Sequence, residues 1–261
     1  MTNFIQVDAS KCKRDGMCAE VCPLGSIETD DDGAPRQAKD AQCIECGHCV
    51  AVCPHGALTN GKLKMDRFQP VLKTLPSSGA VRGLMLSRRS VRAYKDRLVE
   101  AQVMSGLVDI ARHAPTAVNF QKVSWLACVD PGKAKAVAGE TIEWLRGSGI
   151  YPRMVEFWDQ GREVVLRGAP AFVVAYSPVE YNWGAEDCTI ALTYLELAAA
   201  SAGLGACWAG LLTRAAQNHK PLAAMLGIPE GHVARGGLML GYPKYRYRLV
   251  PPRNEAKLRW M

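Results

Sequence analysis

Seven of the ten cysteines lie between Cys12 and Cys53, and their spacing is suited to binding metal. Residues 43–54 follow the pattern C-x2-C-x2-C-x3-C-P. Three thiolates at this spacing can point at three irons of one cubane, and the fourth, which precedes the proline, points towards a second cluster. The chain starts without the basic residues and apolar core of a signal peptide, so this tight group indicates metal binding rather than disulfides.

The cysteine segment occurs twice, at an offset of 31 residues. Three cysteines and a proline recur in each copy, whereas Asp15 stands where the second copy has a cysteine. The pattern predicts one cluster held by Cys22, Cys43, Cys46 and Cys49. It predicts another held by Cys12, Cys18, Cys53 and, if it is a ligand, Asp15. A zinc ribbon is the alternative, but the C-x3-C-P ends do not suit it.

On these motifs, residues 4–66 resemble the two-cluster bacterial ferredoxins. The resemblance implies two 4Fe-4S clusters. Some ferredoxins of this type place an aspartate at the position of Asp15, which implies either carboxylate ligation or a three-iron (3Fe-4S) cluster. A hard oxygen ligand holds iron less firmly than a thiolate, so a fourth iron bound there would be easily lost. In the other interpretation, Asp15 is a solvated turn residue beside a degraded site.

A short basic segment opens the rest of the chain and is suited to a phosphate. Three guanidiniums and a hydroxyl occur within five residues, as Arg88, Arg89, Ser90 and Arg92. Arginine's rigid fork can bind phosphate oxygens in pairs. Four further motifs follow in order, at residues 114–121, 203–210, 240–243 and 251–253.

This ordered set resembles the FMN-dependent nitroreductase superfamily, over residues 80–261. The resemblance implies an α+β fold that dimerises, with FMN at the subunit interface. It implies a ribityl phosphate held by Arg88, Arg89, Ser90, Arg92 and Arg253. It implies flavin-ring contacts from Pro115, Thr116 and Asn119 of the other subunit, and from Trp208, Ala209 and Gly210, whose backbone N–H groups would lie near the flavin N5 atom. Thr116 departs from the family, which often has serine there, and so does Lys122-Val-Ser-Trp125, where the family often has Pro-Trp.

Some of these residues also have a purely structural interpretation. Arg89 then faces solvent, Asn119 caps a turn and Trp208 packs in the core. The sequence assigns no general acid, because no histidine lies in a motif tied to the flavin.

Periodicity predicts helices over 100–114, 133–146, 154–167 and 185–202, and strands over 123–129, 171–176 and 233–240. The expected fold class is α+β, with a ferredoxin-type domain over 1–66, a linker over 67–86 and a nitroreductase-like FMN domain over 87–261. Within the linker, Pro76–Gly79 is the expected flexible point. No Gly-x-Gly-x-x-Gly follows a strand, so no separate dinucleotide-binding domain is expected.

Composition narrows the class of protein further. The 261 residues are 48% hydrophobic and 22% charged, which excludes a largely disordered chain. No run of about 18 apolar residues occurs, so no membrane association is expected. The net charge is +7, but no zinc-finger spacing or RNA-binding aromatic motif accompanies it, which argues against nucleic acid. The expected location is the cytoplasm.

Together these features predict an oxidoreductase in which iron–sulfur clusters pass electrons to FMN. The flavin would reduce a planar electron-poor small molecule, such as a nitroaromatic or quinone, and the donor would be reduced ferredoxin or NAD(P)H. Two alternatives remain open. One is related flavin chemistry, such as dehydrogenation, ene reduction or reductive dehalogenation; the other is an electron-transfer or redox-sensing protein without a substrate.

Overall fold

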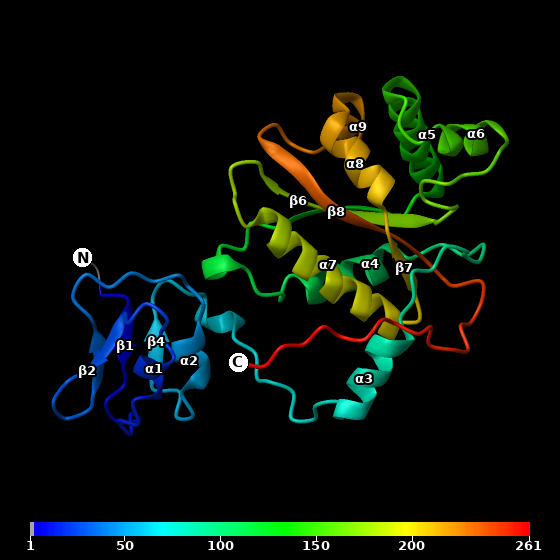
Figure 1. The fold of residues 1–261 in the computed structure, drawn as a ribbon. Coiled ribbons are helices and arrows are strands. Elements are labelled where there is room, and N and C mark those ends of the chain that lie inside the picture. Colours follow the sequence, from blue (N-terminus) through cyan, green and yellow to red (C-terminus); the bar gives the residue numbers. More distant parts are fainter. Residues whose placement is uncertain (1–2) are drawn as a thin grey trace. The chain divides into compact units, whose positions relative to one another are not determined.

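The computed structural model describes residues 3–261, and its contacts divide the chain into two units (Figure 1). The first extends to Leu75 and includes 118–120; the second comprises 76–117 and 121–261. Residues 1 and 2, with which the expected ferredoxin domain begins, lie outside the described residues. The domain limits expected at 66 and 86 stay a prediction.

The first unit is built from one supersecondary pattern used twice. Its elements are β1 (Ile5–Val7), α1 (Met17–Glu20), β2 (Ile27–Thr29), β3 (Pro35–Gln37), α2 (His48–Val52), β4 (Leu58–Asn60) and the 3-10 turn η1 (Met65–Arg67). Strand β1 pairs with β4 and β2 with β3, both antiparallel. Helices α1 and α2 follow glycines with the same left-handed backbone, Gly16 at φ 74° and Gly47 at φ 75°. The two copies therefore turn towards their cysteines in the same way.

The second unit is a four-stranded antiparallel sheet between two layers of helices (Figure 1). The strand order is β5 (Ser124–Cys128), β6 (Ala171–Pro178), β8 (His232–Gly241) and β7 (Gly205–Trp208). One core lies between the sheet and α4 (Ala101–Ala111) and α7 (Gly184–Ser201). The other lies between the sheet and α5 (Pro131–Ser148), α6 (Pro152–Asp159), α8 (Gly210–Asn218) and α9 (Lys220–Met225). The α+β prediction is confirmed.

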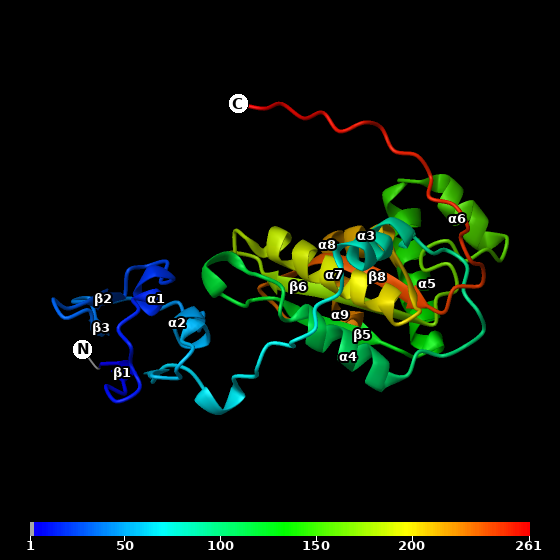
Figure 2. The ribbon, with the colours of Figure 1, turned by 90° about the horizontal axis from the view of Figure 1, so that it is seen from below.

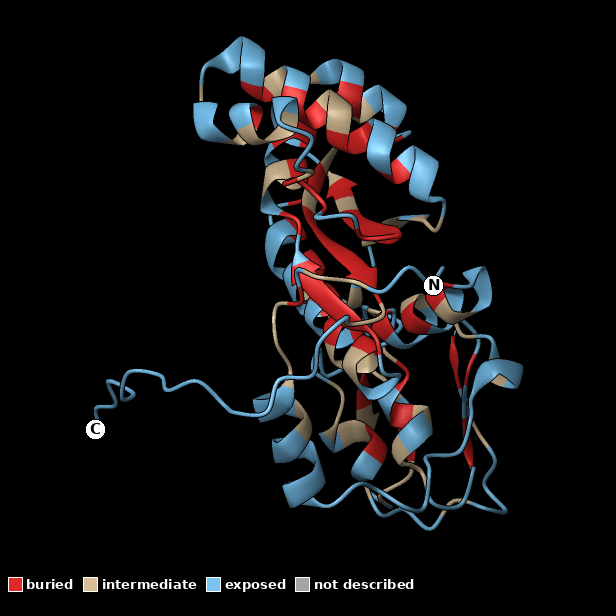
Figure 3. Ribbon diagram, turned by 90° about the vertical axis from the view of Figure 1, so that its right-hand side faces the viewer, coloured by how far each residue is buried: buried red, intermediate tan, exposed pale blue. Residues whose placement is uncertain are grey.

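The central strand β6 explains why the sheet needs both layers. Residues 171–175 are apolar and all buried, and the strand is buried throughout its centre in Figure 3. Phe172 and Val174 face one core, whereas Val173 and Ala175 face the other. Because successive side chains of a strand point to opposite faces, a strand without polar alternation must be covered on both sides.

The helix expected over 154–167 is shorter in the structure, because α6 ends at Asp159. Gly161 follows with a left-handed backbone, φ +80°. The Glu163 carboxylate then accepts backbone N–H groups of Val165 at 2.7 Å and Gly168 at 2.5 Å. A carboxylate that satisfies loop N–H groups stabilises the loop against continued helix.

In the second unit, periodicity did not predict strand β7 or the helices α8, α9 and α3 (Ser78–Ser87). Helix α3 lies within the segment expected as a linker, and the Ser77 side chain accepts the Ala80 N–H at 3.2 Å as its N-cap. At the other end of the unit, residues 250–261 run as an exposed arm without helix or strand (Figure 2). Among residues 3–261, no helix combines the length and apolarity needed to cross a bilayer.

Candidate cofactor sites

The cysteines of the first unit line two separate cavities. Cys43, Cys46 and Cys49 come from one loop and the start of α2, and Cys22, from the end of the first copy, faces the same cavity. The other cavity is lined by Cys12, Cys18 and Cys53, together with Asp15. In each cavity, three of the four positions come from one copy of the repeat and the remaining cysteine, Cys22 or Cys53, comes from the other copy. The two-cluster pattern predicts this exchange.

The cysteine sulfurs of each cavity are spread around its wall and do not converge on one point. Among residues 3–261, no three His, Cys, Asp or Glu side chains converge closely enough to hold one metal ion. One cavity offers three thiolates and Asp15, and the other offers four thiolates. Both sets of donors suit the iron atoms of an iron–sulfur cluster. The residues present therefore fit two iron–sulfur clusters.

Hydrogen bonds to sulfur occur at equivalent places in both copies. The Ser26 N–H donates to the Cys22 Sγ at 3.2 Å, and the Ala57 N–H donates to the Cys53 Sγ at 3.4 Å. Although burial opposes it, the hydrogen bonds from Ser26 hold the pKa of Cys22 below its ordinary value. Donors of this kind stabilise a thiolate, which is the form that binds iron.

One contact from a side chain to sulfur has no counterpart in the other copy and was not expected from the sequence. The Asn60 side-chain amide donates to the Cys43 Sγ at 3.6 Å, and Asn60 is buried. The equivalent position, 31 residues earlier, is the exposed Thr29. No sequence signal marked it, because Asn60 ends the largely polar strand Leu58–Asn60 and its burial arises only in the fold.

In the second unit, the basic segment after α3 lies beside β7. Ser90 forms a parallel bridge with Ala206, and the Val91 N–H donates to the Ala206 carbonyl at 2.9 Å. Gly205 permits this approach, since a Cβ there would stand 2.5 Å from the Val91 Cγ2. The segment that carries the arginines is thus held against the strand that leads to Trp208.

The segment and the C-terminal part of the chain enclose one cavity, which we call the phosphate cavity. It is lined by all five residues expected at the ribityl phosphate: Arg88, Arg89, Ser90, Arg92 and Arg253. Arg89 donates from Nη1 to the carbonyls of Leu86 and Arg88, at 2.7 and 2.6 Å. Its Nε is buried and has no hydrogen-bond partner among the described residues. An orphaned donor among arginines is the feature that an anionic ligand would satisfy.

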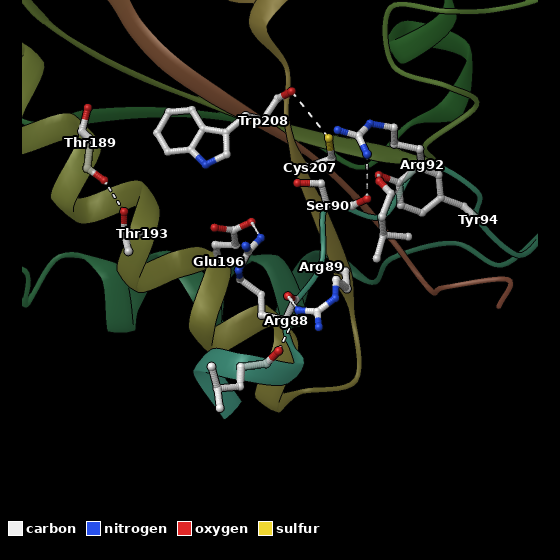
Figure 4. Close-up of polar contacts among 12 residues, drawn as sticks. Arg88, Arg89, Ser90, Arg92, Tyr94, Thr189, Thr193, Glu196, Cys207 and Trp208 are labelled. Atoms are coloured by element: carbon white, nitrogen blue, oxygen red, sulfur yellow. Dashed lines mark hydrogen bonds and ion pairs between the residues drawn. The ribbon is translucent and has the colours of Figure 1, made fainter. Parts of the chain in front are cut away.

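Arg88 also has a partner that the sequence did not indicate. Its Nη1 lies 2.8 Å from the Glu196 Oε1 on α7, and the Glu196 side chain is 8% exposed (Figure 4). The available signal was that Glu196 is the one polar side chain within residues 195–200 of α7, although its partner could not be predicted from the sequence. The pair fixes one wall of the phosphate cavity, and it leaves the other guanidinium nitrogens of Arg88 for a ligand.

Breaking this pair should destabilise the second unit. Arg88→Ala leaves Glu196 buried without its partner, which should lower the free energy of unfolding by about 2–3 kcal/mol. This is less than for a fully buried pair, since the Arg88 side chain is still 26% exposed. Glu196→Gln, which removes the charge instead, should cost less in the same background. Denaturant unfolding of the apoprotein measures both; equal stability of Arg88→Ala and wild type would contradict the prediction.

Gly205→Ala should displace the basic segment from β7. The added methyl would overlap Val91, so we expect weaker FMN binding and a loss of about 1–3 kcal/mol in stability from overpacking. Adding Val91→Ala should recover part of both. Gly147→Ala is the matched control, since nothing lies within 4 Å of a Cβ at that helical position. Flavin fluorescence titration and thermal unfolding test this, and an undisturbed Gly205→Ala protein would contradict it.

The residues expected beneath the flavin ring follow β7 directly. Trp208 is 38% exposed at the end of the strand, and α8 begins at Gly210. The Ala209 N–H already donates to the Gly237 carbonyl at 2.9 Å. The first N–H groups of a helix lack intrahelical partners, so Gly210 and its neighbour Leu211 are the better candidate donors to a flavin.

Pro115, Thr116 and Asn119 are the other residues expected at the flavin ring. None of the three lines the phosphate cavity or the cavity that contains Trp208. The Thr116 hydroxyl accepts the Gln121 N–H at 3.1 Å. Asn119 belongs by its contacts to the first unit, whereas Pro115 and Thr116 belong to the second. Their expected contact with a flavin from the other subunit stays a prediction.

Two buried residues hold the loop next to Thr116, and the sequence did not reveal them. The Asp187 Oδ1 accepts the Ala117 N–H at 3.1 Å, and the Tyr181 hydroxyl donates to the Asp187 Oδ2 at 2.5 Å. Burial, together with the hydrogen bond to Asp187, raises the pKa of Tyr181 above its ordinary value. Tyr181 therefore stays protonated and keeps its hydrogen bond at neutral pH.

Comparison with known proteins supports the predicted family of each of the two domains. Residues 85–242 match the Nitroreductase family, and residues 4–54 match the 4Fe-4S dicluster domain. A protein of Archaeoglobus fulgidus, named as a candidate NADH dehydrogenase/NAD(P)H nitroreductase, is 28% identical over 62% of this chain and 84% of its own length. A protein of Methanothermobacter thermautotrophicus with the same name is 25% identical over 60% of this chain and 74% of its own.

Solved structures show the same fold. A nitroreductase of Bacteroides fragilis with bound FMN has a TM-score of 0.61 and 23% identity, and the match covers 69% of this chain and 97% of that one. A nitroreductase of Desulfitobacterium hafniense with bound FMN has a TM-score of 0.58 and 20% identity, with the same coverage. Since the family match spans more than half of the residues, the chain belongs to the nitroreductase family of oxidoreductases and carries an N-terminal 4Fe-4S dicluster domain.

Proposed function

We propose that this oxidoreductase binds FMN and two iron–sulfur clusters, and that it transfers electrons from the clusters to a planar electron-poor acceptor. The observation that carries the proposal is the phosphate cavity, in which the partnerless Arg89 Nε lies among three further arginines. The bridge between Ser90 and Ala206 joins this cavity to the strand that ends at Trp208. One FMN could therefore place its phosphate and its ring on adjacent residues.

In this proposal the chain's own residues bind and orient. Arg88, Arg89 and Arg92 hold the phosphate, and the start of α8 offers N–H groups to the ring. Bound FMN would supply the redox chemistry, since a flavin can collect single electrons from clusters and release two together. Reduction of a nitro group to a nitroso group takes up two electrons and two protons and releases water. Joining both domains in one chain keeps donor and acceptor at high effective concentration.

The homodimer is part of the same proposal, and exposed apolar surface supports it. Helix α3 has no buried residue, and Met85 is 55% exposed. Ile190 and Tyr194 are exposed on α7. Leu249, just before the C-terminal arm, and Leu258 and Trp260 within it are exposed as well. Apolar surface on this scale is typical of an interaction site, and a second copy of the chain would cover it.

The electron donor and the compartment are also proposed. The names of the relatives favour NAD(P)H, whereas the dicluster domain favours reduced ferredoxin. A cytoplasmic location is part of the proposal, because cysteines that bind metal rather than form disulfides suit a reducing compartment. The alternative is an electron-transfer or redox-sensing protein. Anaerobic turnover of nitroaromatics and quinones with reduced ferredoxin, compared with NAD(P)H, separates these; reduction of FMN without turnover of any acceptor would favour the alternative.

Cofactor content is the direct test of the proposal. Protein purified without oxygen should contain FMN, sulfide and about seven to eight irons per chain, because one cluster has four thiolates and the other only three and Asp15. Metal analysis, sulfide assay and flavin chromatography measure this. Zinc without sulfide would contradict the cluster assignment, and iron without FMN would contradict the flavin assignment.

A further inference from the structure

A second cavity near Trp208 has an unusual concentration of positive charge. Its walls include Arg92, Arg167 and Arg214, together with Tyr151, Trp208 and Gly210, and we call it the arginine cavity. Its volume is about 440 Å³, in the range of ~300–1,000 Å³ that is usual for small-molecule sites. Arg167, Tyr151 and Arg214 have no role in the phosphate site.

The charge in this cavity is not neutralised by the protein. No carboxylate is among its lining residues, and within residues 3–261 none of its three arginines forms an ion pair. Other arginines of the second unit do find carboxylates: Arg97 pairs with Glu100, Arg112 with Asp109 and Arg146 with Asp159. In the proposed holoenzyme Arg92 would face the FMN phosphate, so Arg167 and Arg214 are the unpaired guanidiniums left on this concave surface to attract another anion.

Two of the arginines are positioned by specific contacts. Arg214, on α8, donates from Nη1 to the Tyr151 hydroxyl at 3.1 Å, and its guanidinium lies 5.7 Å from the centre of the Tyr151 ring. Arg167 lies in the loop that Glu163 stabilises, between two N–H groups that the Glu163 carboxylate accepts. Among the described residues, Glu163 forms these backbone hydrogen bonds and no ion pair with Arg167.

The backbone at this cavity is also strained. Tyr151 has φ +52° and Arg167 has φ +58°, a left-handed conformation that residues with a side chain rarely adopt. Strained residues that are retained at a cavity wall are typical of binding sites, where the strain fixes the direction of the side chain.

We propose that the arginine cavity binds the carboxylate of the electron acceptor, so that the acceptors of this protein are aromatic or quinonoid acids rather than neutral compounds. The inference rests on the proposed function, since Trp208 and Gly210 are expected beneath the flavin and also line this cavity. A guanidinium pairs with a carboxylate through two parallel hydrogen bonds, and the start of α8 at Gly210 adds the positive end of a helix dipole.

The test compares an acid with its neutral isostere on the holoenzyme. Without oxygen, and with an excess of reduced ferredoxin or NAD(P)H to supply two electrons for each nitro group reduced, steady-state kcat/KM is measured for 4-nitrobenzoate and for 4-nitrobenzamide. The acid should be preferred, and Arg167→Gln or Arg214→Gln should lower the ratio of the two values about tenfold, through KM rather than kcat. Arg153→Gln is the matched control, because Arg153 carries the same charge on α6 but does not line the cavity. It should leave the ratio unchanged.

Binding of benzoate gives a readout that does not depend on turnover. By calorimetry, the oxidised holoenzyme should bind benzoate more tightly than benzamide, and both arginine variants should lose this preference while retaining FMN. If benzoate binds but neither nitro compound is turned over, the arginine cavity does bind a carboxylate and the proposed function is overturned. If kcat/KM is equal for both nitro compounds and benzoate is not preferred over benzamide, the arginine cavity does not bind the acceptor's carboxylate. The proposed function would then remain intact.

Two further outcomes would also overturn the proposal. If Arg167→Gln and Arg214→Gln lose FMN, the cavity belongs to the flavin phosphate. If NADPH competes with benzoate while 4-nitrobenzoate and 4-nitrobenzamide have equal KM, the anion bound there is the phosphate of the donor.

Discussion

Replacing Arg88 and Arg92 with alanine should weaken FMN binding by roughly 10²–10⁴-fold. Each charge-assisted hydrogen bond to a phosphate contributes about 1.5–3 kcal/mol, and the variant loses at least two. Both side chains line the phosphate cavity, and each approaches it from the segment that Ala206 holds in place. Fluorescence titration of the apoprotein measures the dissociation constant directly.

The controls separate phosphate recognition from general damage. Riboflavin lacks the phosphate, so its weak binding should be the same in the wild type and the variant. Arg112→Ala removes an exposed arginine that pairs with Asp109 on α4, and it should leave FMN affinity unchanged. Adding Glu196→Gln to the double variant removes the orphaned carboxylate and should restore stability without restoring affinity. If riboflavin and FMN lose affinity equally, these arginines do not bind the phosphate.

The grouping of the cysteines around two cavities could be predicted from the sequence because it depends on local geometry. Spacing within a turn decides which sulfurs can face one cavity, and the 31-residue repeat fixes the exchange of Cys22 and Cys53 between the copies. The left-handed glycines before α1 and α2 follow the same repeat. Asn60 could not be predicted, because its approach to Cys43 depends on the pairing of β1 with β4.

In the second unit, the sequence motifs expected to bind flavin could be predicted. The residues and the strand that hold those motifs in place could not. Arg253 reaches the same cavity as Arg88 across more than 160 positions of sequence, and only the resemblance to a family suggested that. Glu196 and Asp187 act through pairing across the fold, which no local pattern records. Strand β7 is four residues long, too short for an alternation pattern to stand out from the loop around it.

The two clusters should differ in their resistance to oxidation, and we expect Asp15 to be the cause. The cavity of Cys22, Cys43, Cys46 and Cys49 offers four thiolates. The other offers three thiolates and the Asp15 carboxylate, which accepts the Met17 N–H at 3.2 Å. A carboxylate binds iron more weakly than a thiolate does. Mild oxidation should therefore remove one iron from this cluster alone and produce the electron paramagnetic resonance signal of a 3Fe-4S cluster.

Asp15→Cys should abolish that signal. The new thiolate would take the place that Cys46 has in the other copy, ahead of a glycine with the same left-handed backbone. Asp15→Asn is the matched control: it keeps the size of the side chain but removes the anionic ligand, so its three-iron signal should be present before any oxidation. Spin quantitation during stepwise oxidation by ferricyanide gives the comparison. Equal resistance of wild type and Asp15→Cys would mean that Asp15 is not at the weak corner of the cluster, because a carboxylate and a thiolate at that corner cannot hold iron equally.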